Sequence, residues 1–321
     1  MTNGREGDME RSRLRKDVVI VGSGPAGLSA ALNLGRGRKK VLVCDAGTRR
    51  NAAAEHMHGF VSRDGIPPGE FRAIGREQLA RYDVELRDVR VARVERHEGV
   101  FHVELEDGTL VEARRMLLAT GLVDQPLDLP GFRELWGKAL FQCPYCHGWE
   151  IQDRAWGVVA SGEHSLEFAQ FVKGWSADVT LFTNGVLEVS AEQRERLRRA
   201  EVRLVEPRIR RLVVSASDAG ALEAVELEDG TRVARDVLFV HPPQKQVPLV
   251  ESLVRTMGLA LDDMGFVRVD AFQQTSVPGL YAAGDLTTRL QGALVAAAAG
   301  AMSAYRMNHE LNMEAVGGSH G

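Results

Sequence analysis

The sequence has few cysteines, no long apolar run and no excess of positive charge. Only three cysteines occur in 321 residues, too few for the disulfide framework of a secreted protein, so a cytoplasmic protein is expected. The alanine-rich run 293–304 is too short, and interrupted by a glycine, to span a bilayer. The net charge of −4 gives no electrostatic basis for binding nucleic acid or an anionic membrane, and neither partner is expected.

The composition is that of a chain able to bury a large core. It is 44% hydrophobic and 26% charged, and its length suggests two domains. Residues 1–16 are polar, of mixed charge and without the apolar centre of a secretory signal. They are expected to be a disordered tail, as are residues 311–321.

The pattern of a dinucleotide-binding unit lies over residues 17–45. An apolar strand, a glycine-rich turn, a helical run and a second strand ending in Asp45 follow one another there. Gly22 permits the sharp reversal, Gly24 lets a pyrophosphate approach the backbone and Gly27 lets the helix pack on the strand. Asp45 is placed to bind a ribose hydroxyl. The whole turn is therefore expected to contact the cofactor: Gly22, Ser23, Gly24, Pro25, Ala26 and Gly27.

A second pattern of strand, turn, helix and strand over residues 155–183 has an incomplete turn. In place of the three glycines it has Ala160, Gly162 and Ser165. After the next strand no arginine is available to hold an adenosine 2′-phosphate. The pattern therefore gives little support to NADPH binding, and the unit is interpreted as a fold kept for its shape.

A Cys-X-X-Cys pair, Cys143 and Cys146, is followed directly by His147. Two thiols at this spacing can close a small disulfide ring and act as a two-electron switch. The same pattern fits half of a zinc site or two buried thiols, but a zinc site needs two further ligands and no second cysteine pair exists. His147 titrates near neutral pH and can take or give a proton. We assign these three residues a catalytic role and expect no metal.

The carboxyl-terminal part carries a further candidate motif. A short strand ends in Gly284 and Asp285, a loop reaches Gln291, and an alanine-rich helix follows from Gly292. Taken alone, a Gly-Asp pair after a strand is more often a turn. Beside the first glycine turn, Asp285 can accept hydrogen bonds from a ribityl chain, and the helix N–H groups can face the pyrimidine end of a flavin. Cofactor contacts are therefore expected here, up to Ala293.

The loop 49–70 is rich in turns and carries Asn51, His56 and His58. Two histidines separated by one residue could ligate a metal. Without a carboxylate partner, polar loop residues that line a cofactor or solvent are the simpler interpretation.

Together these motifs resemble those of the low-molecular-weight thioredoxin reductases. The matching pieces occur in the same order: the Gly22–Gly27 turn with Asp45, Thr120-Gly121, Cys143-Pro-Tyr-Cys146, Tyr281-Ala-Ala-Gly-Asp285 and Gln291. The resemblance implies an α/β fold with two Rossmann-like three-layer domains, the second inserted in the first, and a homodimer. It places an FAD-binding domain at residues 17–125 and 244–310, and an NAD(P)-type domain with the cysteine pair at residues 126–243.

The resemblance also implies FAD as the cofactor. Cys146 would face the flavin, and Cys143 would exchange with the substrate. The expected FAD contacts are completed by Ala46, Arg50, Asn51, His58, Val91, Ala119, Thr120 and Gly121.

Three departures favour one branch of this family. The second glycine turn is incomplete, His147 stands where the reductases have an acidic residue, and Leu290 stands where an arginine usually precedes the glutamine. The run Cys143–Trp149, with the histidines near residue 56, resembles the gliotoxin-oxidase and holomycin-type dithiol oxidases. Members of that branch make disulfides in small natural products and give the electrons to oxygen. We therefore expect oxidation of a small dithiol, with O2 as the acceptor and hydrogen peroxide as a product.

Three other interpretations stay open. One is NADPH-dependent reduction of a thioredoxin-like protein. Another is a related enzyme that receives electrons from ferredoxin or another protein. The third is a flavin-bound redox sensor whose cysteines switch a partner surface.

Overall fold

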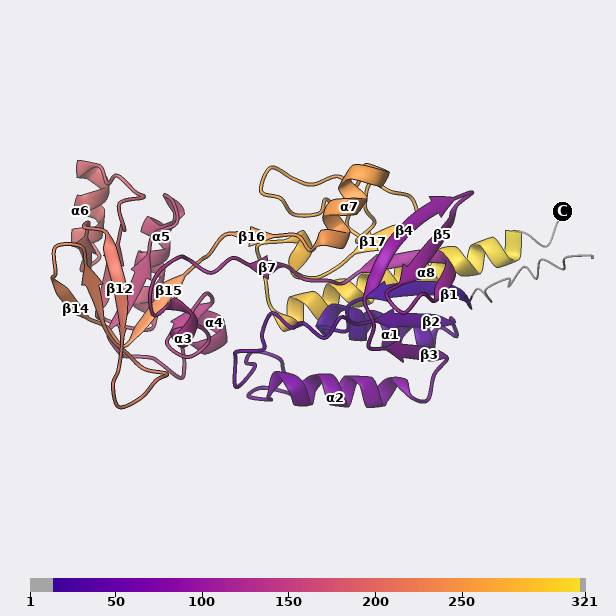
Figure 1. Cartoon of the computed structure of the whole chain (residues 1–321), viewed down its shortest axis with the longest axis horizontal. Coiled ribbons are helices and arrows are strands. Elements are labelled where there is room, and N and C mark those ends of the chain that lie inside the picture. Colours follow the sequence, from indigo (N-terminus) through magenta and orange to yellow (C-terminus); the bar gives the residue numbers. More distant parts are fainter. Residues whose placement is uncertain (1–13, 318–321) are drawn as a thin grey trace, which may run out of the picture. The chain divides into compact units, whose positions relative to one another are not determined.

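The computed structural model describes residues 14–317, which fold into two compact units (Figure 1). The first unit contains the described residues up to Arg49, together with Gly69–Leu122 and the residues from Gln246 onward. The second contains Arg50–Pro68 and Val123–Lys245. The middle of the sequence thus forms a unit inserted into one built from both ends of the chain, which confirms the expected α/β arrangement.

The first unit is built on a seven-stranded sheet. Its strands are β1 (Leu14–Val21), β2 (Val41–Cys44), β3 (Val84–Arg87), β4 (Val91–His97), β5 (Val100–Leu105), β6 (Leu110–Leu118) and β17 (Leu280–Ala282). The parallel strands follow the order β3-β2-β1-β6-β17, and the β4–β5 hairpin pairs antiparallel with the first half of β6. All side chains of β2 are buried and apolar, as expected of a parallel strand covered on both faces.

Two separate cores lie on the two faces of this sheet. The helices of the unit are α1 (Pro25–Arg36), α2 (Pro68–Leu79), α7 (Pro248–Met257), the 3-10 helix η2 (Asp285–Thr287) and α8 (Ala293–Gly317). Ile20 of β1 belongs to a core with buried residues of α1 and α8. Its neighbour Val19 belongs to a core with Phe101 of β5 and Leu253 of α7. Adjacent strand residues therefore face opposite layers, which gives a three-layer, Rossmann-like unit.

Both expected tails are partly structured. Residues 14–16 begin β1 and pair with residues 111–113 of β6, because Leu14 packs against the core despite its charged neighbours. At the other end α8 continues to Gly317, and Leu311 is 2% exposed. The rest of the two expected tails, residues 1–13 and 318–321, lies outside the described residues. Within residues 14–317, no helix combines the length and hydrophobicity needed to cross a membrane.

The second unit repeats the plan of the first. Its strands are β8 (Leu140–Phe141), β9 (Trp156–Val159), β10 (Val179–Phe182), β11 (Val202–Val205), β12 (Ile209–Val214), β13 (Leu222–Leu227), β14 (Arg232–Ala234) and β15 (Val237–Val240). Its helices are α3 (Phe132–Leu135), α4 (Pro144–His147), α5 (His164–Phe171), η1 (Val172–Gly174) and α6 (Ala191–Arg199). A parallel sheet of order β11-β10-β9-β15-β8 packs α5 and α6 on one face and the antiparallel β12–β14 sheet on the other.

Two short strands, β7 (Val123–Asp124) and β16 (Gln244–Lys245), pair antiparallel where the chain enters and leaves the second unit. These strands lie within two residues of the boundaries that the resemblance implied. Residues 50–68 also belong to the second unit, whereas the resemblance placed them in the first domain. The physical reason is local, because Arg50 binds Asp124 of β7 through two hydrogen bonds.

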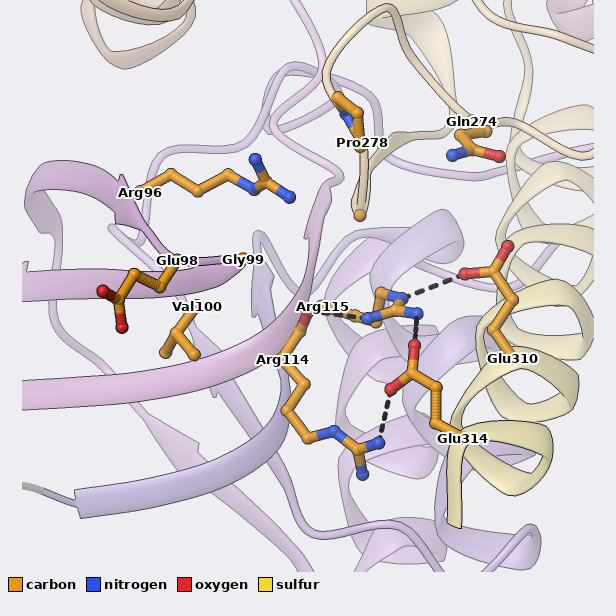
Figure 2. A pocket seen from close by; sticks show the side chains of 11 residues that line it. Arg96, Glu98, Gly99, Val100, Arg114, Arg115, Gln274, Pro278, Glu310 and Glu314 are labelled. Carbon is orange, nitrogen blue, oxygen red and sulfur yellow. Dashed lines mark hydrogen bonds and ion pairs between the residues drawn. The ribbon is translucent and has the colours of Figure 1, made fainter. Parts of the chain in front are cut away.

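Ion pairs hold the end of α8 against β6 (Figure 2). Arg115 donates to Glu310 at 2.9 Å and to Glu314, and Arg114 also donates to Glu314. The Arg115 and Glu310 side chains are 13% and 18% exposed, whereas those of Arg114 and Glu314 are 41% and 43% exposed. These residues line part of an open cavity of about 440 Å³. Because water screens exposed pairs, the Arg115–Glu310 pair is the one expected to contribute to stability.

Replacing Arg115 with glutamine should lower the free energy of unfolding by about 2 kcal/mol, because half-buried Glu310 loses one of its two cations and keeps only the more exposed Arg306. The matched change Arg114→Gln should cost less than about 1 kcal/mol, because its pair is exposed. Urea unfolding followed by far-UV circular dichroism measures both. Equal losses in the two variants would show that burial does not decide the strength of these pairs.

Candidate functional site

The turn between β1 and α1 is closed by contacts that leave no room for side chains. Gly22 has φ +106°, and a Cβ at this position would fall 2.8 Å from the carbonyl carbon of Ala119. A Cβ on Gly27 would fall 3.0 Å from the carbonyl carbon of Gly22. The turn is therefore packed between the end of β6 and the first residues of α1, as the sequence pattern predicted.

Gly24, by contrast, faces open space. Nothing lies within 4 Å of a Cβ built on it. Gly24 is the N-cap of α1, no side chain caps this end, and Pro25 occupies the first position. The N–H groups at the start of α1 therefore face a space that no side chain fills, and a phosphate can bind to such N–H groups. This observation fits the pyrophosphate of a dinucleotide.

The carboxyl-terminal motif lies at the same place. A Cβ on Gly284, which has φ +98°, would lie 3.3 Å from the Cβ of Ala26 and 3.5 Å from the Cβ of Ala296. Asp285 follows directly, so it lies next to the first turns of α1 and α8. Gly292 precedes α8 and also faces open space. Two helix N-termini and a carboxylate thus converge at the carboxyl ends of the parallel strands, where open α/β sheets bind ligands.

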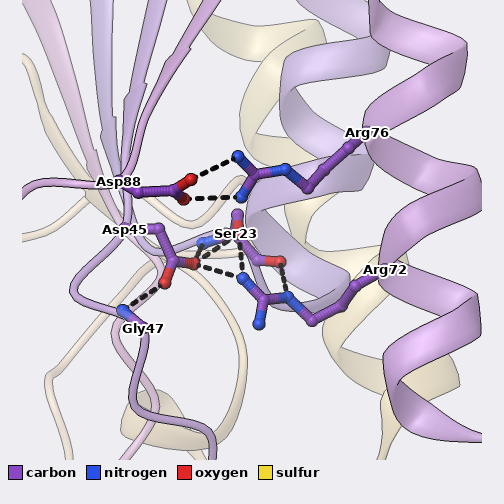
Figure 3. Close-up of polar contacts among 6 residues, drawn as sticks. All are labelled: Ser23, Asp45, Gly47, Arg72, Arg76 and Asp88. Atoms are coloured by element: carbon purple, nitrogen blue, oxygen red, sulfur yellow. Dashed lines mark hydrogen bonds and ion pairs between the residues drawn. The ribbon is translucent and has the colours of Figure 1, made fainter.

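Asp45 is fixed to the glycine turn by hydrogen bonds (Figure 3). Its Oδ2 accepts from the N–H of Ser23 at 2.8 Å, from the Ser23 hydroxyl and from Arg72 at 3.0 Å, and its Oδ1 accepts from the N–H of Gly47 at 2.6 Å. Burial raises the pKa of Asp45, but these hydrogen bonds and the charge of Arg72 outweigh it, and the pKa lies below its usual value. Asp45 is therefore an anionic acceptor of fixed orientation, as a ribose hydroxyl requires.

Other predicted cofactor residues of the first unit surround this region or support it. Ala46 is exposed directly after Asp45, Thr120 and Gly121 follow the end of β6, and Gln291 precedes α8. Val91, the first residue of β4, is only 4% exposed and packs into the core. Its side chain therefore belongs to the fold, and only its backbone is available to a ligand.

Three predicted cofactor residues belong to the other compact unit. Arg50 donates to both carboxylate oxygens of Asp124, at 2.8 and 2.9 Å, and to the side-chain oxygen of Gln142 at 2.8 Å. Asn51 is exposed, and His58 is half-buried. All three residues belong to the second unit.

In the second unit Cys143 and Cys146 form a disulfide, with their Cα atoms 5.3 Å apart. Cys143 is the N-cap of the one-turn helix α4, and Pro144 occupies the first helical position, where its missing N–H is tolerated. Both cysteines are half-buried. The remaining cysteine, Cys44, is buried in β2, and burial raises the pKa of its thiol to about 12. Cys143 and Cys146 therefore form the reducible pair, and Cys44 is inert.

His147 stands beside this pair as a potential base. Its ring stacks on Phe141, with centroids 4.3 Å apart, and its buried Nδ1 has no hydrogen-bond partner in the described part of the chain. Burial, and then the charge of His58, lower the pKa of His147 below its usual 6.5, while Glu150 acts in the opposite direction. The imidazole is therefore neutral at pH 7 and can accept a proton.

His58 lies close to this histidine, a placement that the sequence did not reveal. Its Nδ1 is 3.5 Å from Glu150 and 3.7 Å from Asp64. The N–H of Glu150 in turn donates to the carbonyl of His147 at 3.1 Å. One carboxylate near His58, Asp64, comes from the same loop, and the other, Glu150, is brought to it by the fold. Among residues 14–317, however, no three such side chains are arranged to hold a metal ion.

An aromatic cluster borders the cysteine pair. Tyr145, between the two cysteines, is 73% exposed. Its ring centroid lies 6.0 Å from that of Phe171 and 5.4 Å from that of Trp175. Trp149, just beyond α4, is 74% exposed. The second unit therefore presents apolar rings next to its disulfide, a feature that the spacing of these residues in the sequence did not indicate.

The second glycine turn, between β9 and α5, is filled by side chains. The Ser165 hydroxyl accepts from the N–H of Ser161 at 3.0 Å, and the Ser161 hydroxyl lies 3.2 Å from His164 Nε2. Glu163 is the N-cap of α5. A carboxylate therefore stands at the end of the helix that a phosphate would approach in the first unit.

Thr183 occupies the position in the second unit that Asp45 holds in the first. Each residue directly follows the strand beside the central one, β10 or β2. Thr183 is 1% exposed, and its hydroxyl donates to the carbonyl of Glu206 at 3.0 Å. The next residue, Asn184, accepts from the N–H of Ile209 at 2.8 Å. The residues that directly follow β10 thus serve the fold and offer no acid for a ribose, and the side chain of Arg208 lies beside Gly185.

Comparison with known proteins agrees with this geometry. Residues 16–300 match the family model described as pyridine nucleotide-disulphide oxidoreductase. The chain is 37% identical to thioredoxin reductase tcpT of Claviceps purpurea, over 84% of this chain and 86% of that relative. It is 30% identical to thioredoxin reductase aclD of Aspergillus oryzae, over 90% and 94%.

Solved structures show the same similarity. The crystal structure of HlmI matches with a TM-score of 0.87 at 37% identity, over 94% of both chains. An oxidoreductase from Agrobacterium tumefaciens matches with a TM-score of 0.86 at 36% identity, over 94% of this chain and 99% of that one.

The open space at Gly24 generates a prediction. Gly24→Ala adds a methyl group where nothing in the protein stands, and its φ of −73° suits alanine. Stability should therefore be unchanged, while affinity for FAD should fall at least about tenfold, because the pyrophosphate loses its close approach. Isothermal titration of the apoprotein with FAD and a urea unfolding curve measure the two effects.

Gly27→Ala is the matched control, because its methyl group meets the Gly22 backbone. It should lower the free energy of unfolding by about 2 kcal/mol. Loss of stability in Gly24→Ala, or unchanged FAD affinity, would contradict the assignment of this turn.

Proposed function

We propose that the protein oxidises a small dithiol to a disulfide, with O2 as the electron acceptor. The chain belongs to the pyridine nucleotide-disulphide oxidoreductase family and is an FAD-dependent disulfide oxidoreductase similar to thioredoxin reductases. One dithiol and one O2 yield one disulfide and one hydrogen peroxide, so two electrons and two protons leave the substrate. The proposal includes independence from NADPH.

The contrast between the two glycine turns carries this proposal. The first turn has an open N-terminus at Gly24 and an acid, Asp45, whose Oδ1 accepts only from the N–H of Gly47 among the hydrogen bonds described. In the second, Glu163 stands at the helix N-terminus and Thr183 replaces the acid. A helix N-terminus attracts a pyrophosphate, whereas a carboxylate there repels one. A reaction that takes its electrons from a dithiol needs only the first of these sites.

The cysteine pair supplies the thiol chemistry. A substrate thiolate attacks Cys143 and breaks the Cys143–Cys146 bond, which leaves a mixed disulfide and the Cys146 thiolate. The second substrate thiolate then displaces Cys143, so the product leaves as a disulfide and both cysteines are reduced. His147 accepts a substrate thiol proton on its neutral imidazole, while stacking on Phe141 holds the ring in place.

FAD would be held by the Gly22–Gly27 turn, Asp45, Asp285 and the N-terminus of α8. When bound, it supplies the two-electron acceptor that links the reduced cysteine pair to O2.

The aromatic cluster favours a small, apolar substrate. Tyr145, Phe171 and Trp175 offer ring faces and edges to a planar or apolar molecule beside the reacting sulfurs. A thioredoxin-like protein is the competing partner, because relatives of this chain carry the name thioredoxin reductase. We favour the small dithiol, since an oxidase that uses no NADPH has no electrons to give to an oxidised protein partner.

We also propose that the enzyme is a homodimer that uses α8. Apolar side chains are exposed along one side of this helix at helical spacing: Leu294, Val295, Met302, Tyr305, Met313 and Val316. An apolar stripe of this length on a charged chain is typical of a surface that another protein covers. A second copy is the simplest occupant, as the family resemblance implies.

Anaerobic mixing tests the direction of electron flow. A small dithiol should bleach the flavin absorbance of the purified, FAD-loaded protein, and readmitted air should restore it with formation of hydrogen peroxide. NADPH should not bleach it, because the second unit has no complete nucleotide turn. Cys146→Ser should keep its FAD and lose bleaching by the dithiol. Rapid bleaching by NADPH would favour a reductase, and bleaching by neither compound would favour a protein donor or a redox sensor; either result overturns the proposal.

The lowered pKa of His147 generates a pH prediction. A base works in its neutral form, so dithiol bleaching in the wild type should stay fast down to below pH 6.5 and fall only at lower pH. His147→Ala should slow bleaching by about 10²-fold at pH 7 and remove this fall. Stopped-flow absorbance across the pH range measures both. The control His56→Ala, which changes an exposed histidine of the nearby loop, should leave the pH profile unaltered. If His147→Ala also leaves the profile unaltered, His147 is not the base.

A further inference from the structure

An arginine from outside the glycine turn reaches into it. Arg72 lies in the first turns of α2, and its side chain is 14% exposed. Its Nη2 donates to the Ser23 hydroxyl at 2.7 Å and to Asp45 Oδ2 at 3.0 Å, and its Nε donates to the Ser23 carbonyl at 3.2 Å (Figure 3). Ser23 is completely buried, and Asp45 is 7% exposed. One guanidinium therefore connects the turn, the acid and a third element of the fold.

These contacts use one carboxylate oxygen of Asp45 and spare the other. Oδ2 already accepts from the Ser23 N–H, the Ser23 hydroxyl and Arg72. Oδ1 accepts only from the N–H of Gly47 among the hydrogen bonds described. A carboxylate oxygen has about two lone pairs, so Oδ2 has none left and Oδ1 can accept one more donor. The orientation of the carboxylate thus decides which oxygen a ligand meets.

We propose that Arg72 is a positioning residue for the adenosine half of FAD. By occupying Oδ2 it holds Asp45 with Oδ1 toward the ribose, and its positive charge offsets the carboxylate beside the cofactor's negatively charged pyrophosphate. The proposal rests on the assignment of FAD to the Gly22–Gly27 turn. It adds a residue that lies outside the strand–turn–helix–strand pattern by which such sites are found.

The chemistry of arginine suits this role. Its planar fork donates to two acceptors at once in a fixed geometry, which a lysine ammonium does not do. The next turn of α2 provides a comparison, because Arg76 also binds a carboxylate, Asp88, through two hydrogen bonds at 2.8 and 3.0 Å. In that pair the Asp88 side chain is 71% exposed, and none of the hydrogen bonds described links either residue to the glycine turn. Arg76 is therefore a natural control.

The test measures FAD affinity of the apoprotein by flavin fluorescence quenching. Arg72→Gln should weaken FAD binding about 10- to 100-fold, the range expected for losing hydrogen bonds to a charged group. Arg72→Lys should recover part of this loss, and Arg76→Gln should change nothing. A loss in Arg76→Gln as large as that in Arg72→Gln, or no loss in Arg72→Gln, would overturn the proposal.

A double-mutant cycle separates positioning from general support of the fold. Asp45→Asn alone should weaken FAD binding, and adding Arg72→Gln to it should cause little further loss, because Arg72 acts through the carboxylate. The same fold-loss in both backgrounds would mean that Arg72 only supports the structure. If Arg72→Gln does not fold, the cycle is run with Arg72→Lys. Absence of FAD binding by the wild type would instead refute the proposed function itself.

Discussion

Backbone packed against backbone sets the geometry of the first unit. A side chain on Gly22 would run into Ala119, one on Gly27 into Gly22, and one on Gly300 would fall 2.8 Å from the carbonyl carbon of Ala26. These contacts draw α1, α8 and the end of β6 together, so that both helix N-termini open toward the same space. Because glycine alone fits these positions, the turn, the carboxylates and the helix ends form one site.

The second unit shows that the same topology can be kept while its ligand chemistry changes. It repeats the parallel sheet, yet serine and histidine side chains make hydrogen bonds within its turn, and the Thr183 hydroxyl donates to the carbonyl of Glu206. Its chemistry lies elsewhere, in the disulfide at the start of α4 and in the histidine that follows it. The two units thus share one topology, but the first carries the proposed cofactor turn and the second carries the redox-active cysteine pair.

The parts of the site that the sequence predicts are those whose chemistry is local. The Gly22–Gly27 turn with Asp45 and the Cys143–Cys146 pair have fixed spacings, so their geometry follows from neighbouring residues. Arg72 and the carboxylate of Glu150 beside His58 are brought in by tertiary packing, and nothing in their spacing marks them. Val91 shows a different limit, since the sequence does not reveal that the side chain of this expected cofactor contact packs in the core and leaves only its backbone for a ligand. The ends of β1 and α8 extend beyond the predicted limits because Leu14 and Leu311 pack into the two cores.

The central claim is that electrons pass between the Cys143–Cys146 pair and a flavin held by the first unit. An anaerobic titration with a small dithiol tests it most directly, when flavin absorbance and free protein thiols are followed together. We predict that full bleaching consumes one equivalent for the flavin and one more for the disulfide, with the new thiols confined to Cys143 and Cys146. Complete bleaching while this disulfide stays oxidised, or a fully reduced pair beside an oxidised flavin, would contradict the claim.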